Sequence, residues 1–509
     1  MTRVPDAPAL PVRDPWPGDP ARGARLLKGE LELGGGTRGL RPGFWAEPSG
    51  PALLRASAHG FTWLRDLRAL GTDAARLRAR ALVSDWIGTG ASDALAQRPD
   101  VAGARIAAWL GHYDFFFAAA DDAFRQRLMA RLVADARGLS AALPTDEIDA
   151  RALTALKGLI AAAVALPEQG GFLARAQRFL PQEILRQIAP DGSQGERSPA
   201  ILLGALQDLT EIRTLLQAAQ ASPPPQLGPA IERLAGALRC LRHGDGGLAL
   251  FNGSKEDHAG LIELVLTQAG RGGRSPLALP EGGFHRLAAG RTVVLADCGL
   301  PPPIGLDMMA HAGTLSFEMS VGRERLIVNC GAFPAGGAEW RDAARATAAH
   351  STLVIGDVNS SELRPDGLGR RPTKVETQRQ EANGAHWLEA SHDGWLKPFG
   401  AVHRRRLYLA ESGEDLRGED AIEAPTPQPF AIRFHLHPAV HANLQQDGVA
   451  ALLRLPGGGG WRLRAEGARV SVEESIYLGG PEPRRAEQVV LSGAPDGPQH
   501  VKWAISKVK

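Results

Sequence analysis

Two patterns of apolar positions divide the chain. Between about Gly60 and Cys240, apolar residues recur at i, i+3, i+4 and i+7, and Ala, Leu and Arg dominate. This period is typical of amphipathic helices built from strong helix formers. The segments that follow it are Asp73–Ile87, Val101–Ala120, Asp122–Leu139, Ile148–Leu166, Phe172–Ile188, Ser198–Ala219 and Pro229–Leu241. Because their connections are short, they predict helical hairpins packed into an incomplete α/α toroid, with a plain helical bundle as the alternative.

The pattern changes after the glycine-rich loop that begins at His243. From about Gly283 onward, short runs rich in β-formers alternate with Gly, Pro, Asp and Asn. The predicted strands are Arg291–Ala296, Leu315–Met319, Leu326–Asn329, Thr352–Ile355, His386–Ser391, Arg404–Leu409, Phe430–Leu436, Val449–Leu455, Trp461–Ala465, Val470–Tyr477, Gln488–Leu491 and His500–Ile505. Strands that follow helices, rather than alternate with them, indicate successive domains.

The predicted fold class is therefore α+β multidomain. An N-terminal incomplete (α/α) toroid of helical hairpins is followed by a C-terminal antiparallel β-sandwich-like domain. We expect an extended N-terminal arm, the toroid, a connecting segment and the β domain, at residues 1–55, 56–250, 251–284 and 285–509.

Composition narrows the class of protein. The 509 residues are too many for one ordinary core. At the level of the whole chain, the formal net charge of +2 gives no support for a surface that binds nucleic acid or another acidic polymer, although a balanced total is compatible with a local basic cleft. The three cysteines lack any Cys-x-x-Cys spacing, so no disulfide framework is expected. No apolar run is long enough for a transmembrane segment, and the first residues lack the apolar core of a signal peptide.

Candidate chemistry is concentrated between Asp307 and Leu363. His311 lies in a polar turn before one predicted strand, Asn329 follows the next strand, and His350 precedes a third. Because side chains at strand ends can converge, we expect His311, Asn329 and His350 to form one polar cluster at the end of a sheet, facing the helical domain. The alternative for each histidine alone is a side chain that caps a turn.

This stretch resembles the C-terminal domain of the heparinase II/III family of polysaccharide lyases. The family pattern is a His-x-His-x-Asp turn, a strand ending in Ser-Phe, a strand ending in Asp-x-Gly and an Arg-x-Thr-x-x-His-Asn segment. The matching segments here are Met309–Gly313, Ser316–Phe317, Asn329–Gly331 and Arg345–Ser351. The helical half carries a similar motif from Gln187 to Pro199, which in the family continues to a catalytic tyrosine where this chain has Ile201.

The resemblance implies β-elimination on an acidic polysaccharide that contains uronic acid, such as a glycosaminoglycan. A base removes the C5 proton while cationic or hydrogen-bonding groups neutralise the carboxylate. Ile201 and Met309 replace the family's tyrosine and first histidine, and Ala150–Ala163 lacks its Asn or Asn-His pair. The remaining catalytic candidates are His311, His350, His243, His435 and Arg345, and the substrate-binding candidates are Arg197, Glu196, Asn252, Trp340 and Arg433.

Three functions remain open. The first is a heparinase II/III-like lyase with a degenerate active site. The second is a non-catalytic protein that binds saccharides or assembles cell-envelope polysaccharide. The third is a hydrolase, which would need two carboxylates, with Glu196 and Asp191 as candidates. In the first two, the partner is an acidic polysaccharide or oligosaccharide.

Location and metal content follow the resemblance. It implies the cell envelope or periplasm, whereas the visible N-terminus favours the cytoplasm as the alternative. The family's zinc ligands would fall on His311, Asn329 and His350. Two imidazoles and an amide lack the carboxylate charge of a His₂Asp set, so the alternative is a hydrogen-bonded polar cluster without zinc.

Overall fold

The computed structural model describes residues 4–46, 50–117, 119–167, 171–270, 273, 275–445 and 448–508. The chain divides into two compact units. Unit 1 contains Met1–Ile188, Gly204–Glu232 and Pro334–Gly337, and unit 2 contains Ala189–Leu203, Arg233–Phe333 and Ala338–Lys509. Two helices, α10 (Pro199–Ala218) and α11 (Leu227–Cys240), contribute residues to both units.

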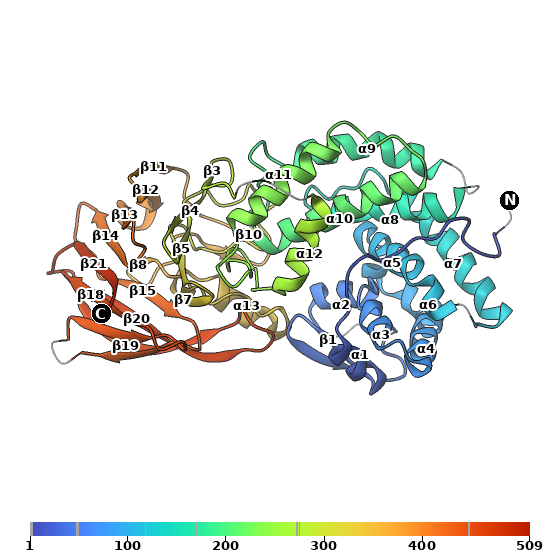
Figure 1. The fold of residues 1–509 in the computed structure, drawn as a ribbon, viewed down its shortest axis with the longest axis horizontal. Helices are drawn as coiled ribbons and strands as arrows, with labels where there is room; N and C mark the ends of the chain where they lie inside the picture. The colour runs from blue at the N-terminus through green and yellow to red at the C-terminus, as the bar shows by residue number, and fades with distance from the viewer. Residues whose placement is uncertain are drawn as a thin grey trace. The chain divides into compact units, whose positions relative to one another are not determined.

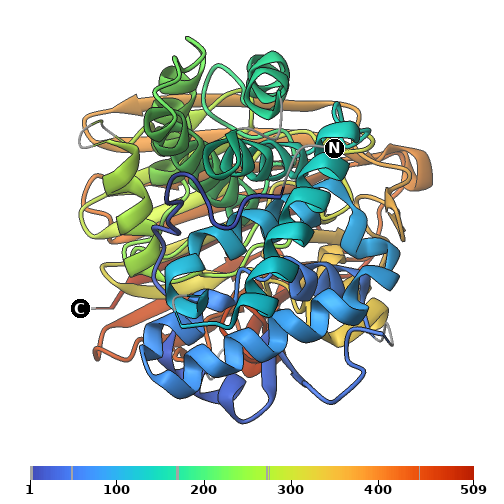
Figure 2. The same cartoon turned by 90° about the vertical axis from the view of Figure 1, so that its right-hand side faces the viewer.

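Unit 1 is helical (Figures 1 and 2). Its further helices are α1 (Pro20–Leu27), α2 (Ala52–His59), α3 (Leu64–Leu70), α4 (Asp73–Thr89), α5 (Pro99–Gly111), α6 (Tyr113–Phe117), α7 (Asp122–Ala141), α8 (Arg151–Ala165) and α9 (Phe172–Gln187). Helix α8 is apolar around most of its circumference, as a central helix must be, and packs against α5, α7 and α9. The α5–α8 crossing is close because both helices present glycine there: a Cβ on Gly158 would lie 2.2 Å from Cα of Gly103.

The expectation of an extended arm over residues 1–55 is corrected by this structure. The segment contains α1 and the antiparallel hairpin of β1 (Glu30–Leu33) and β2 (Gly36–Gly39). Asp19 caps α1 with its carboxylate, and Pro20 occupies the first helical position. Trp16 and Trp45 are buried.

Unit 2 contains two large antiparallel sheets (Figure 1). The eight-stranded sheet has the order β11 (Val375–Ala382), β12 (Ala385–Trp395), β13 (Ala401–Leu409), β14 (Asp415–Glu423), β21 (His500–Lys507), β18 (Gly460–Glu466), β17 (Ala450–Arg454), β16 (His441–Leu444). The nine-stranded sheet has the order β19 (Arg469–Tyr477), β20 (Arg484–Gly493), β15 (Phe430–Leu436), β7 (Glu324–Val328), β6 (Phe317–Val321), β5 (Thr292–Asp297), β4 (Phe284–Ala289), β3 (Ala278–Leu279), with β8 (Leu353–Ile355) paired to β15. A separate two-stranded sheet pairs β9 (Leu363–Arg364) with β10 (Gly367–Leu368).

One hydrophobic core joins the two large sheets. Phe317 of β6 stacks on Trp503 of β21, with ring centroids 5.7 Å apart and planes 7° apart. Gly418 of β14 makes room for the indole, because a Cβ there would lie 2.0 Å from the Trp503 ring. The predicted succession of a helical region and antiparallel sheets is confirmed.

Among the described residues, three α-helices lie C-terminal to the helical region predicted for residues 56–250. Helix α12 (Ala259–Ala269) occupies the expected connecting segment, and α13 (Gly337–Arg345) lies between β7 and β8. The third, α14 (Leu396–Phe399), is a single turn between β12 and β13. The cysteines are buried free thiols. None of the helices in the described ranges has the length and apolar character needed to cross a membrane.

Candidate functional site

The centre of the candidate site is a pair of histidines in unit 2. Nδ1 of His311 lies 3.0 Å from Nε2 of His350, and the two rings are nearly perpendicular. His311 comes from the turn before β6, and His350 from the segment before β8. A glycine permits this approach, since a Cβ on Gly313 would lie 2.6 Å from Cδ2 of His350. The family pattern has aspartate at this position, and its side chain would occupy the space of the His350 ring.

The hydrogen bonds define how the two imidazoles share their protons. Nδ1 of His350 donates to the carbonyl oxygen of Ala346 at 2.8 Å, so its Nε2 carries a lone pair when the ring is neutral. Nδ1 of His311 therefore donates to that nitrogen, which leaves the lone pair of His311 on Nε2. Burial lowers the pKa of His350 to about 4. Burial, together with His350 and Arg345, lowers the pKa of His311 well below its usual value. Both rings are therefore neutral at pH 7.

The turn that carries His311 is fixed by two buried side chains. Oδ1 of Asn252 accepts the backbone N–H of His311 at 3.0 Å, and Nδ2 of Asn252 donates to the carbonyl oxygen of Arg197 at 2.9 Å. The Arg345 guanidinium donates to the carbonyl oxygens of Ala310, Arg364 and Gly367 at 2.9, 2.9 and 2.6 Å. Burial and Arg341 lower the pKa of Arg345 to about 10, which leaves it charged at pH 7. Asn252 and Arg345 therefore hold the turn that carries His311 in place.

Asn329 joins the histidine pair through the backbone. Its Oδ1 accepts the N–H of Ser351, the residue after His350, at 2.9 Å. Its own N–H donates to Oε1 of Glu318 at 2.9 Å. The Glu318 carboxylate is fully buried and also accepts a hydrogen bond from Nε2 of His243 at 2.7 Å. His243 thus lies in a second buried polar group, and burial lowers its pKa.

Arg197 and Glu196 belong to the motif that the helical half shares with the family. Arg197 is buried, forms an ion pair with Asp297 and donates Nε to the carbonyl oxygen of Gly282 at 2.7 Å. Glu196 is half-buried and accepts from the side-chain amide of Gln194 at 3.1 Å. The Asp191 carboxylate accepts the N–H groups of Ser193, Glu281 and Gly282 at 2.9, 2.7 and 3.1 Å. The motif is thus held by contacts within its own turn and by contacts to Glu281, Gly282 and Asp297. Both oxygens of the Asp191 carboxylate accept backbone N–H groups, which does not favour Asp191 as one of the two carboxylates of a hydrolase.

The other sequence candidates lie around β15 and α13. His435 is buried, its nitrogens contact Ser475 Oγ and the carbonyl oxygen of Ala348, both at 2.8 Å, and burial lowers its pKa to about 3. Arg433 donates to Oε1 of Gln488 at 3.2 Å. Trp340 is half-buried with its ring edge against Phe333, centroids 5.4 Å apart. In the described part of the chain, none of these three side chains forms a hydrogen bond or ion pair with His311, and their roles stay predictions.

Two residues near the pair were not among the sequence candidates. Glu318 occupies an alternating position of β6, which resembles the exposed face of an ordinary strand, yet both faces of β6 are buried. Arg341 donates to the carbonyl oxygen of Met308 at 2.6 Å, and its charge helps to lower the pKa of His311. Arg341 is partly exposed, so it is a cation of this region that a carboxylate could reach.

The tyrosines do not restore the missing acid. Tyr477 is buried, donates its hydroxyl to Glu256, and has a pKa raised well above its usual value by burial. Tyr408 lies on the outward face of the eight-stranded sheet, and Tyr113 belongs to unit 1. Ile201 and Met309, at the family's tyrosine and histidine positions, have no titratable group.

The residues in this cluster do not fit a zinc ion. The Asn329 oxygen is already used by Ser351, and the rest of its side chain is an N–H donor, which cannot ligate a cation. Within the described ranges, no three His, Cys, Asp or Glu side chains are grouped to hold a metal. Two imidazoles alone lack the ligand number of a structural or catalytic zinc site.

The family description "Heparinase II/III-like, C-terminal" matches residues 271–504. FtsZ-localized protein C of Caulobacter vibrioides is 33% identical over 526 aligned residues, which cover 97% of this chain and 89% of the relative.

Solved structures share the fold at low sequence identity. Heparinase III has a TM-score of 0.76 at 15% identity, covering 91% of this chain and 79% of that structure. Heparan sulfate lyase HepC from Pedobacter heparinus has a TM-score of 0.62 at 15% identity, covering 96% of this chain and 82% of that structure. The fold is thus the toroid-plus-β fold of polysaccharide lyases. The chain belongs to the heparinase II/III family.

Proposed function

We propose that this chain is a non-catalytic member of the heparinase II/III family that acts by binding, in association with the cell-division protein FtsZ. The observation that carries the proposal is the end-to-end similarity to FtsZ-localized protein C, 33% identity over 97% of this chain. That similarity extends well beyond residues 271–504, the part that matches the family's C-terminal domain. A shared role of the whole chain therefore explains it better than a shared domain.

The geometry supports the loss of elimination chemistry. An eliminase needs a base of suitable pKa near the substrate and an acid for the departing oxygen. His311 and His350 hydrogen-bond to each other, and their lowered pKa values make them weak bases. Ile201 and Met309 supply neither group.

Co-sedimentation tests the association. Purified chain is mixed with FtsZ of the same organism and centrifuged after GTP-driven polymerisation, with GDP as the control. The proposal predicts that the chain pellets with the polymer and stays in the supernatant with GDP.

A degenerate lyase is the second candidate, and the tautomer of His311 favours it. With Nδ1–H donated to His350, the lone pair on Nε2 could accept the C5 proton of a uronide. The electrons of the C5–H bond would form the C4–C5 double bond as the C4–O bond breaks, and water would protonate the departing oxygen. Absorbance of the unsaturated uronide, measured on a panel of glycuronans, separates the candidates. Absorbance that is lost in His311→Ala would establish the lyase, and no absorbance supports the binding protein.

A further inference from the structure

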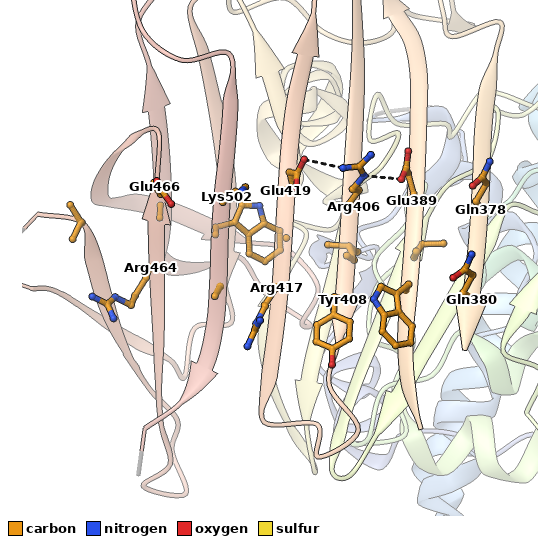
Figure 3. A pocket seen from close by; sticks show the side chains of 18 residues that line it. Gln378, Gln380, Glu389, Arg406, Tyr408, Arg417, Glu419, Arg464, Glu466 and Lys502 are labelled. Carbon is orange, nitrogen blue, oxygen red and sulfur yellow. Dashed lines mark hydrogen bonds and ion pairs between the residues drawn. The ribbon is translucent and has the colours of Figure 1, made fainter. Parts of the chain in front are cut away.

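The outward face of the eight-stranded sheet carries a groove whose lining includes neither His311 nor His350. Its volume is about 780 Å³, and most of its lining comes from six adjacent strands, β11, β12, β13, β14, β21 and β18 (Figure 3). All of these residues belong to unit 2.

Strand register aligns the lining into two rows that cross the strands. The first row pairs Gln378, Glu389, Arg406, Glu419, Lys502 and Glu466 in succession. The second row pairs Gln380, Trp387, Tyr408, Arg417, Ala504 and Arg464 in the same way. Directly opposed side chains on neighbouring strands lie about 5 Å apart at Cβ, so each row is a continuous line of contacts.

The second row presents an aromatic platform. Trp387 is 41% exposed, and its ring centroid lies 5.0 Å from that of Tyr408. The Arg417 guanidinium lies 5.9 Å from the Tyr408 ring and forms an ion pair with Asp415 at 2.8 Å. Ala504 is the short residue between Arg417 and Arg464, so the floor of the groove is low at that point.

The charges of the groove are only partly neutralised. Arg406 joins Glu389 and Glu419 of the first row, at 2.7 and 3.2 Å (Figure 3). Among the described residues, neither Arg464 nor Lys502 has a carboxylate within ion-pair distance. Among these residues, Glu466 likewise has no cation within that distance. Two cations against one acid leave the Arg464 side of the groove with a free positive charge.

We propose that this groove binds an acidic oligosaccharide that lies across the strands, with one ring on the Trp387–Tyr408 platform and a carboxylate at Arg464 and Lys502. Planar polar side chains such as Gln378 and Gln380 suit hydroxyl groups, and exposed aromatic faces suit the apolar face of a sugar ring. A peptide could not add as a strand here, because the inner strands already use their backbone groups within the sheet. The site is independent of the proposed association with FtsZ.

Isothermal titration calorimetry on the full chain tests the site. The probes are hexasaccharides of hyaluronan, chondroitin, polygalacturonate and alginate, with chitohexaose as the neutral comparison and a hexaglutamate peptide as the acidic comparison. We expect at least one acidic hexasaccharide to bind, and to bind more tightly than either comparison. Trp387→Ala and Arg464→Ala should each weaken it about tenfold.

Arg469→Ala, an exposed arginine of β19 in the other large sheet, is the matched control and should leave the affinity unchanged. Both test positions are exposed, so circular dichroism of these variants should match the wild type. The proposal is overturned if no acidic hexasaccharide binds, if both groove variants bind like the wild type, or if hexaglutamate binds as tightly. Co-sedimentation with FtsZ would be unaffected by such a result, so the two proposals fail separately.

Discussion

His311 and His350 are hydrogen-bond partners, with Nδ1 of the first 3.0 Å from Nε2 of the second. Nε2 of His350, which could otherwise ligate a metal or contact a substrate, is therefore engaged by the His311 side chain. The same region departs from the family pattern at three positions. Gly313 and Asn329 stand where the family has aspartate, and Met309, which has no titratable group, stands where it has histidine.

Removal of one member of the pair should destabilise the fold. His350→Ala leaves the Nδ1–H of His311 without its partner in a buried site, and it removes one of the two donors to the carbonyl oxygen of Ala346, which keeps the N–H of Ala349. We expect a loss of about 2–4 kcal/mol in the free energy of unfolding, measured by urea denaturation. His258→Ala is the control, because His258 is exposed and makes no capping hydrogen bond, and it should cost no more than about 0.5 kcal/mol.

Stability should depend on pH through the same pair. Burial lowers the folded-state pKa of His350 to about 4, whereas an unfolded histidine has a pKa of about 6.5. The unfolded state therefore binds more protons between these values, so the stabilisation is complete above about pH 6.5 and is lost as the pH falls toward 4.

Burial also lowers the pKa values of His243, His311 and His435. The loss of stability with falling pH is therefore steeper than His350 alone would cause. Urea midpoints at pH 7 and pH 5 should differ clearly in the wild type and by less in His350→Gln, which cannot gain the proton. An equal pH dependence in the two proteins would show that His350 does not titrate as inferred.

The pair should also depend on the glycine beneath it. Gly313→Ala places a Cβ 2.6 Å from Cδ2 of the His350 ring, so the ring must move away from His311. We expect the imidazole ¹⁵N shifts of His311 and His350 to change while the protein stays folded. Gly337→Ala meets nothing within 4 Å, although its φ of +80° adds strain, and it should leave those shifts as they are.

Zinc should have no effect on the purified protein. The Asn329 oxygen is engaged by Ser351, and among the residues that the structure describes no carboxylate completes the ligand set, so chelation with EDTA should not shift the melting temperature. A stoichiometric zinc content by atomic emission, together with a lower melting temperature after EDTA treatment, would contradict this interpretation.

Apolar periodicity predicted the main elements closely. Helix α4 begins at Asp73 as predicted, and β15 spans Phe430–Leu436 as predicted, because these segments bury a continuous apolar face. Strand β14 was missed for a physical reason. Its inward positions include Gly418 and Asp420, and the Asp420 carboxylate is stabilised in the core by Arg405 and His403 at 2.7 Å each. Because polar and small residues occupy inward positions of β14, its sequence does not show the alternation of apolar and polar residues that predicts a strand.

The candidate site was predictable only in part. The sequence places His311 and His350 next to predicted strands, which indicated that both histidines would lie at strand ends. Their direct hydrogen bond depends on the space above Gly313, which only the folded chain reveals. The groove could not be predicted, because its rows join residues of six strands through register, and Trp387 and Arg464 are far apart in sequence.

The most direct test of the binding role combines one preparation with two readouts. Wild-type chain is assayed by co-sedimentation with FtsZ polymer and, in parallel, by uronide absorbance on the glycuronan panel. Our account predicts GTP-dependent pelleting with FtsZ and no increase in absorbance on any glycuronan. An absorbance increase that disappears in His311→Ala, with no pelleting above the GDP control, would contradict it.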